Sequence, residues 1–192
     1  MEKEAKMTSL KVFVSSTKED LKEERKAARD AILDLFTIHN LPFKPVMFEY
    51  EFGSHPSSPK QTSLEYVRDS DIFVGIFSER YGSLLPKEGI SITEREYMEA
   101  KKFGKYTLIY VKETEENKRE EKLRDFLKKI GDIEKGSTLS KFKNQYELKE
   151  KIMNDLLEYH RKFELKKMKV VNIESNIPAS IFIDGKYVGD TD

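Results

Sequence analysis

The chain has 192 residues, of which 38% are hydrophobic and 36% charged, and its 35 basic side chains balance its 35 acidic ones. This length allows one well-buried domain and part of a second, and the zero net charge excludes a nucleic-acid-binding surface over the whole molecule. The lack of cysteine excludes disulfides and thiolate chemistry, and three scattered histidines lack metal-ligand spacing, so no metal is expected.

The N-terminal third predicts two strands separated by a long helix. Residues 10–14 form a β-branched and aromatic run that is typical of a strand. The run Ser15-Ser16-Thr17 predicts a cap for an amphipathic helix that ends near Asn40. A second strand is expected at 45–49, followed by a surface loop at 51–60 that contains glycine and proline.

The middle of the chain predicts a short helix at 61–69 and then the most apolar strand, at 71–77. Continuous apolarity, rather than alternation, indicates a central strand that is covered on both faces. After a loop at 78–90, the residues Ser91-Ile92-Thr93-Glu94 have the form of a capping box and open a helix that stops at Gly104.

The remaining elements of the domain are a strand at 106–111, a helix at 123–130, a weak edge strand at 137–142 and a helix from about 144 to 166. Strands and helices thus alternate, which predicts a parallel sheet with right-handed crossovers. Five strands in this order fit an α/β fold of the flavodoxin-like kind, with strand order 2-1-3-4-5, over residues 8–165.

The last segment, residues 168–192, follows a different pattern. Its apolar residues fall among polar neighbours, and Asp184-Gly185 is a hairpin signal. Because two or three strands cannot bury a core alone, we expect a β hairpin that belongs to a truncated β module.

Candidate binding residues lie where the winding of the expected sheet reverses, between strands one and three. The run Ser15-Ser16-Thr17 follows strand one and leads toward a helix N-terminus, which favours a phosphate or carboxylate. The same hydroxyls could instead only cap the helix. After strand three, Arg80 could bind phosphate and Tyr81 could stack on a base, or Tyr81 could be a packed ring in a turn.

Two acidic residues, Glu94 and Glu96, lie in the first turn of the helix after strand three. A carboxylate at the mouth of the cleft could stabilise an oxocarbenium-like ribose or attack it as a nucleophile. The alternative is that these acids only favour a helix N-terminus through its dipole. Arg25 and Arg29, on the first helix, are expected to be solvated partners of nearby acids.

Four blocks of the sequence resemble, in order, family 4062 of the domains of unknown function. The blocks are Lys11–Thr17, Ser70–Gly75, Glu79–Gly82 and Ser91–Tyr97. The resemblance spans residues 8–165 and implies a TIR-like domain, because members of the family are similar to TIR domains. Members commonly stand at the N-terminus of multidomain proteins, including STAND NTPases associated with signalling and antiviral defence.

A second resemblance bears on chemistry. Glu96, Ala100, Gly104 and Lys105 reproduce the E-x3-A-x3-GK spacing of nucleoside 2-deoxyribosyltransferases, in which the glutamate is the nucleophile. TIR-type NAD hydrolases likewise use a helix-borne glutamate to cleave a ribosyl–nicotinamide bond. The resemblance implies that Glu96 is catalytic and that NAD or a related nucleotide is a substrate rather than a cofactor. Glu94 then joins the candidate substrate-binding residues.

The C-terminal segment resembles the front of a PEGA module, a small β domain thought to mediate surface interactions. The two resembling runs are Val170–Ala179 and Ile183–Thr191. The match stops where such a module would continue, which implies that the module is incomplete in this chain.

Two functions follow as expectations. The first is a TIR-like effector or signalling domain that acts as a nucleotide N-glycosidase through Glu96. The alternative is a non-catalytic module that self-associates, docks protein partners or senses a nucleotide, for which the dense mixed charge is suited. The polar first residues, and the lack of an apolar run of roughly eighteen residues, predict a cytoplasmic protein with no membrane partner, and no nucleic-acid partner is expected.

Overall fold

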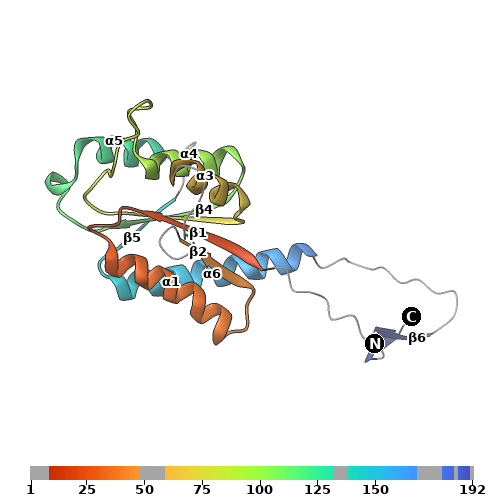
Figure 1. Cartoon of the computed structure of the whole chain (residues 1–192). Coiled ribbons are helices and arrows are strands. Elements are labelled where there is room, and N and C mark those ends of the chain that lie inside the picture. The colour runs from red at the N-terminus through yellow and green to blue at the C-terminus, as the bar shows by residue number, and fades with distance from the viewer. Residues whose placement is uncertain (1–8, 48–58, 132–137, 168–178, 184–185, 191–192) are drawn as a thin grey trace. The chain divides into compact units, whose positions relative to one another are not determined.

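The structure of the protein is a computed structural model, and it describes residues 9–47, 59–131, 138–167, 179–183 and 186–190 (Figure 1). Among these residues, no helix has both the length and the apolar character needed to cross a membrane.

Five parallel strands form one sheet, in the order β2-β1-β3-β4-β5. The strands are β1 (Leu10–Ser16), β2 (Phe43–Val46), β3 (Ile72–Phe77), β4 (Tyr106–Lys112) and β5 (Leu139–Phe142). This order confirms the flavodoxin-like fold expected from the alternation of strands and helices. The winding reverses between β1 and β3, so the carboxyl ends of these two strands border the crevice where such sheets bind ligands.

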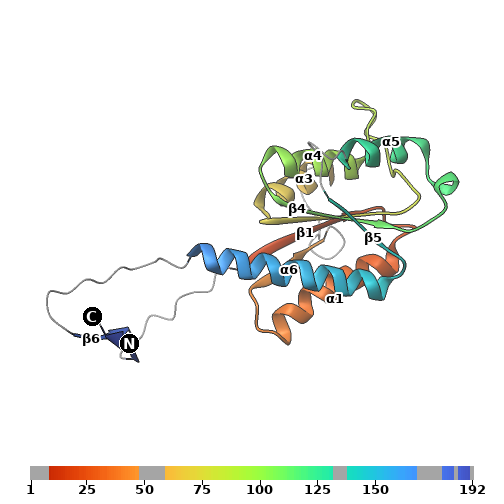
Figure 2. The same cartoon turned by 180° about the vertical axis from the view of Figure 1, so that it is seen from behind.

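Helices cover both faces of the sheet. They are α1 (Lys22–Thr37), α3 (Pro59–Asp69), α4 (Ile92–Lys102), α5 (Glu121–Ile130) and α6 (Gln145–Lys167), with a 3-10 turn at Glu116–Lys118. Helices α3, α4 and α5 lie on one face, and α1 and α6 lie on the other (Figures 1 and 2). Every residue of β3 is buried, as a central strand with two covered faces requires.

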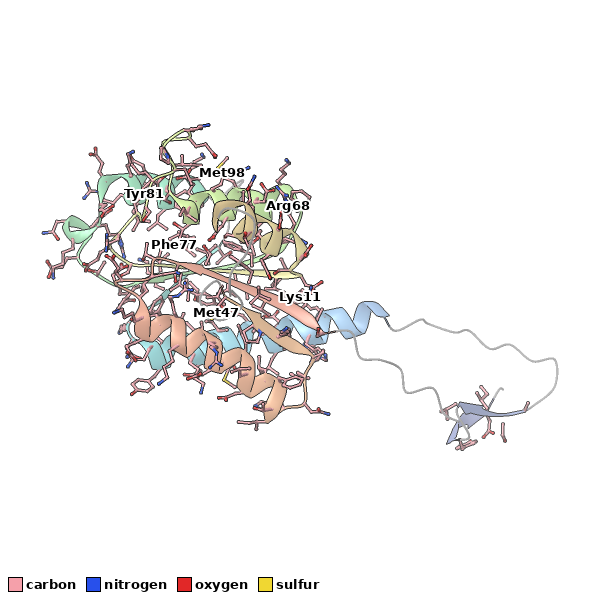
Figure 3. The ribbon with its side chains drawn as sticks, in the orientation of Figure 1. Lys11, Met47, Arg68, Phe77, Tyr81 and Met98 are labelled. Carbon is pink, nitrogen blue, oxygen red and sulfur yellow. The ribbon has the colours of Figure 1, made fainter. Side chains whose placement is uncertain are left out.

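The face under α3, α4 and α5 is packed with aromatic rings. Phe13 of β1 stacks with Phe73 of β3 at 6.1 Å between ring centroids, and Phe77 (Figure 3) meets Phe126 of α5 edge to face at 5.5 Å. Offset and edge-to-face pairs at such distances add to the free energy gained by burial. Because side chains alternate along a strand, the odd-numbered residues of β1 point into this layer.

An acid inside this layer ties α3 to α4. Glu99 of α4 is fully buried and forms ion pairs with Arg68 of α3 (Figure 3) at 2.6 Å and with Arg95 at 3.1 Å. Burial alone would raise the pKa of Glu99, but the hydrogen bond and charge of Arg68, together with the charge of Arg95, outweigh it and lower the pKa. The carboxyl is therefore ionised and holds the two helices in register.

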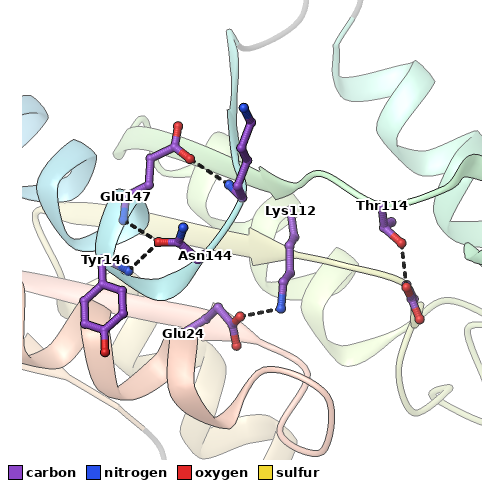
Figure 4. Close-up of polar contacts among 8 residues, drawn as sticks. Glu24, Lys112, Thr114, Asn144, Tyr146 and Glu147 are labelled. Carbon is purple, nitrogen blue, oxygen red and sulfur yellow. Dashed lines mark hydrogen bonds and ion pairs between the residues drawn. The ribbon is translucent and has the colours of Figure 1, made fainter.

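Two predicted helix starts are confirmed. The hydroxyl of Ser91 accepts a hydrogen bond from the backbone N–H of Glu94 at 3.1 Å, which caps α4. Asn144 accepts from the N–H groups of Tyr146 and Glu147, both at 3.1 Å, and so caps α6 (Figure 4).

The helix start predicted at Ser15-Ser16-Thr17 is wrong. Strand β1 continues to Ser16, and α1 begins only at Lys22, with Leu21 at the cap position and no side-chain cap. The strand is longer because Ser15 and Ser16 pair with Gly75 and Ile76 of β3. These two hydroxyls are therefore freed for contacts with other elements, which the next subsection describes.

Strand β2 spans Phe43–Val46 rather than the expected 45–49, because its register pairs Leu10 of β1 with Phe43. Pro45 is tolerated because β2 is an edge strand. The expected loop at 51–60 lies outside the described residues as far as residue 58.

The predicted C-terminal hairpin is present as strands β6 (Ser180–Ile183) and β7 (Lys186–Asp190), which pair antiparallel. Its turn, Asp184-Gly185, lies outside the described residues. By its internal contacts the chain divides into two units, Met1–Leu156 and Leu157–Asp192. The first unit contains the whole five-stranded sheet.

Candidate functional site

A cavity of about 300 Å³ lies at the carboxyl ends of β1 and β3. Five parts of the chain contribute to its wall: the end of β1 and the loop after it, α1, α3, the loop after β3, and α4. The polar residues that line it are Ser15, Ser16, Thr17, Lys18, Glu19, Arg25, Ser63, Arg80, Ser83, Thr93 and Glu96. The cavity therefore lies at the switch point that the sheet order predicts for a ligand site.

The carboxyl of Glu96 is the acid on the α4 side of this cavity. Its side chain is 6% exposed. One carboxyl oxygen accepts a hydrogen bond from the hydroxyl of Ser15 at 2.5 Å, and the other accepts from the hydroxyl of Ser63 of α3. Two hydroxyls from different elements thus fix both oxygens, as an orienting shell around a reactive group does.

Burial raises the pKa of Glu96 above that of an ordinary glutamate. The hydrogen bonds from Ser15 and Ser63 work in the opposite direction, as do the positive charges of Arg25 and Lys18, but they only partly offset the burial. A carboxyl with a raised pKa beside a cavity is a common feature of sites that perform proton transfer or covalent chemistry.

On the other side of β1, the guanidinium of Arg25 meets the next residue of the strand. It donates to the hydroxyl of Ser16 at 2.6 Å and to its carbonyl at 3.3 Å. The expectation that Arg25 is solvated is wrong, since its side chain is 5% exposed. The helix begins five residues later than expected, which turns this position inward. Arg29, as expected, pairs with an exposed acid, Asp30, at 3.8 Å.

The first turn of α1 is held from below by a second ion pair. Glu24, the neighbour of Arg25, is buried and binds the ammonium group of Lys112, at the end of β4, at 2.6 Å (Figure 4). A nearby hydrogen bond of 2.5 Å, between Thr114 and Glu79, links the segments that follow β4 and β3 (Figure 4). These contacts anchor the cavity wall to the sheet.

The mouth of the cavity joins the loops that follow β1 and β3. The guanidinium of Arg80 forms an exposed ion pair with Glu19. Next to it, Gly82 has a φ of +95°, and a Cβ atom placed there would lie 3.0 Å from the side chain of Thr17. Only glycine adopts this backbone conformation easily, so the two loops approach closely at this position.

Two candidate residues lie apart from the cavity. Tyr81 (Figure 3) is buried in the aromatic layer, and its hydroxyl donates to the carboxyl of Glu94. The second oxygen of Glu94 lies 3.9 Å from the ammonium group of Lys129. Burial and the hydrogen bond to Glu94 raise the pKa of Tyr81. Neither residue lines the cavity, so their position gives no support to a role in substrate binding.

The structure thus brings together Ser15, Ser16, Thr17, Arg80 and Glu96, and it adds three residues that the sequence did not single out, Lys18, Arg25 and Ser63. Lys18 could have been suggested by its place directly after the hydroxyl run. No signal in the sequence distinguishes Ser63 from other helical serines, or Arg25 from a solvated helical arginine.

The chemistry available here is that of one carboxyl, several hydroxyls and three cations around a small cavity. Among the described residues, no group of three or more His, Asp or Glu side chains is placed to hold a metal ion. Hydroxyls and guanidinium groups suit a ligand that carries oxygen atoms and negative charge, and a carboxylate suits a carbon centre that develops positive charge.

The family model described as "Domain of unknown function (DUF4062)" matches residues 11–168. Among solved structures, a flavodoxin from the domain Archaea is similar, with 13% sequence identity and a TM-score of 0.43, over 80% of this chain and 99% of that chain. A search of curated proteins finds no match.

Proposed function

This chain belongs to the DUF4062 family, and we propose that it is an N-glycosidase that cleaves the bond between a ribose and a base in NAD or a related nucleotide. The observation that carries the proposal is the carboxyl of Glu96. It is buried at the wall of the cavity at the switch point, and hydroxyls from two elements fix its orientation.

The proposed reaction uses the carboxylate at the anomeric carbon of the ribose. As the bond to the base breaks, positive charge develops on the sugar, and the ionised Glu96 either stabilises it or attacks the carbon to form a ribosyl ester. Water then completes the hydrolysis and releases ribose. For nicotinamide, the leaving group departs as a neutral molecule because its ring nitrogen is positively charged in the substrate.

The test compares two glutamates of the same helix. Purified protein at high concentration is incubated with NAD, and the release of nicotinamide is measured by chromatography. We expect Glu96→Gln to lower the rate by about 100-fold or more, in line with the loss of a positioned catalytic group. Glu94→Gln, whose carboxyl is similarly buried but outside the cavity, should retain most of the activity. Full activity in Glu96→Gln would refute the assignment.

A second function, nucleotide binding without turnover, is supported by a specific feature of the same carboxyl. Both oxygens of Glu96 already accept hydrogen bonds, and burial favours its neutral form. A neutral, fully bonded carboxyl can hold hydroxyl groups of a ligand without attacking it. Calorimetry that shows binding of NAD, together with chromatography that shows no product, would favour this sensing module over the enzyme.

The wider setting is part of the proposal and rests on the resemblances of the sequence. It comprises the TIR-like relationship, a place in cytoplasmic signalling or antiviral defence, the PEGA assignment of residues 168–192, and contacts with protein partners or with further copies of the chain. Light scattering over a range of protein concentrations tests self-association directly.

A further inference from the structure

We infer that the ligand of this cavity carries a phosphate on the same ribose that faces Glu96, and that Arg25 and Lys18 bind that phosphate. The inference rests on the proposed function, since it names the class of nucleotide that the proposed site takes: a 5′-phosphorylated riboside, free or within a dinucleotide, rather than a nucleoside.

The end of β1 separates the two halves of the cavity. Successive side chains of a strand point to opposite faces of the sheet. Ser15 accordingly binds Glu96 on the α4 face, at 2.5 Å, whereas Ser16 accepts from Arg25 on the α1 face, at 2.6 Å. All four side chains line one cavity. A ligand that lies across the end of the strand therefore meets an acid on one side and a guanidinium on the other.

The charges of the lining residues are unequal on the two sides. Glu96 is the acid on the α4 side, whereas Arg25 and the exposed Lys18 bring positive charge to the α1 side. The charges of both cations act on Glu96 and favour its ionised form, which places them within electrostatic reach of the reacting carboxyl. An anionic group bound on the α1 side would complete this arrangement.

A 5′-phosphorylated ribose fits both sides at once. Its anomeric carbon and its phosphate lie on opposite sides of one sugar ring, so a single ring can reach from the acid to the cations. Guanidinium and ammonium groups bind phosphate through charge-assisted hydrogen bonds. An unphosphorylated nucleoside would use the acid and leave the cations of the α1 side without an anion.

The ion pair at the mouth gives the phosphate a competitor. Glu19 and Arg80 both line the cavity and pair with each other at an exposed position. Exposed pairs of this kind contribute little stability and exchange partners readily. An incoming phosphate can therefore take over Arg80 from Glu19, so Glu19 should weaken the binding of anions.

The experiment uses the full chain and measures binding of ribose 5-phosphate and of ribose by calorimetry. We expect ribose 5-phosphate to bind at least tenfold more tightly than ribose, with an affinity that falls as salt is added. Lys18→Gln should weaken ribose 5-phosphate about tenfold, and Glu19→Gln should tighten it. The matched control is Lys118→Gln, an exposed lysine outside the cavity, which should change nothing.

Arg25→Gln is a further variant, but because Arg25 is buried its fold must be verified by circular dichroism. If it does not fold, Lys18→Gln and Arg80→Gln decide the question alone. Equal affinities for ribose and ribose 5-phosphate would overturn the inference, as would equal effects of Lys18→Gln and Lys118→Gln. An affinity that no cavity variant changes identifies adventitious anion binding and also overturns it.

The outcomes separate this inference from the proposed enzyme. If nucleosides are cleaved with the same kcat/KM as their 5′-phosphates, the phosphate site is refuted and the N-glycosidase stands. If ribose 5-phosphate binds with the expected dependence on Lys18 but no nucleotide is cleaved, the phosphate site stands and the enzymatic proposal fails.

Discussion

At the scale of single residues, the two glutamates of α4 show how neighbours with similar burial acquire different chemistry. Glu94 is 7% exposed and Glu96 is 6% exposed. Glu94 meets a tyrosine hydroxyl inside the aromatic layer, whereas Glu96 meets two serine hydroxyls beside the cavity. The difference follows from the helical period, because a shift of two residues turns the side chain about half-way around the helix.

Replacement of Glu96 by glutamine should stabilise the protein increasingly as pH rises. Burial raises the pKa of Glu96 in the native state. Below the ordinary carboxyl pKa of about 4.3, both the native and the unfolded states are protonated. As pH rises from there through the raised pKa, the unfolded state loses its proton first, and native wild-type protein becomes relatively less stable. Glu96→Gln avoids this loss because it does not ionise.

Urea unfolding of both proteins at several values between about pH 4 and pH 8 measures this effect, and each unit of raised pKa corresponds to ~1.4 kcal/mol. The amide can accept from one serine hydroxyl and donate to the other, so the contacts with Ser15 and Ser63 are preserved. Glu94→Gln is the control for the chemical change itself. A difference between Glu96→Gln and wild type that is constant with pH would contradict the raised pKa.

At the scale of elements, the site depends on how closely the loops after β1 and β3 approach. Gly82 determines this approach, because its φ is +95° and its position faces the side chain of Thr17. Gly89, in the same loop, also has a positive φ, +70°, but an added Cβ would meet nothing within 4 Å. The two glycines thus separate the cost of backbone strain from the cost of a clash.

Gly82→Ala should destabilise the protein by about 2 kcal/mol or more, whereas Gly89→Ala should cost only about 1 kcal/mol, the usual penalty of a left-handed backbone. The extra cost arises because Thr17 must move away from the mouth of the cavity. Thermal unfolding of both variants measures the difference. Equal losses would show that the contact between Gly82 and Thr17 does not constrain the loops.

The elements themselves were largely predictable from the sequence, and the polar contacts were not. The continuous apolarity of residues 72–77 identified the central strand, and the capping residues Ser91 and Asn144 located two helix starts. The role of Ser15 was misread because hydroxyl residues serve equally well at a strand end and at a helix cap. Arg25 was misread because a charged residue in an amphipathic helix is usually solvated.

At the scale of the whole molecule, the two units of the chain have unequal means of stabilising themselves. The unit Met1–Leu156 contains the five-stranded sheet and its two helical layers, and helix α6 contributes the buried residues Leu148, Ile152 and Leu156. The unit Leu157–Asp192 contains a single described hairpin, β6–β7. A hairpin of two strands is marginally stable by itself.

Deletion of residues 168–192 should therefore leave the main unfolding transition of the protein within about 2 °C of that of the full chain, since a loss of 1 kcal/mol shifts Tm by roughly 4 °C at this size. Differential scanning calorimetry measures both chains under the same conditions. A decrease of Tm by more than about 5 °C would show that the C-terminal segment supports the sheet.

The position of Ser15 and Ser16 inside the sheet has a consequence for how such a site can change over generations. Their backbone is fixed by pairing with β3, so the gap between the carboxyl and the guanidinium is set by a strand and not by a loop. Substitutions at the exposed positions Lys18, Glu19 and Arg80 can alter which anion is admitted while this internal spacing persists. One scaffold can in this way supply descendants with new ligand preferences at little risk to the acid at its centre.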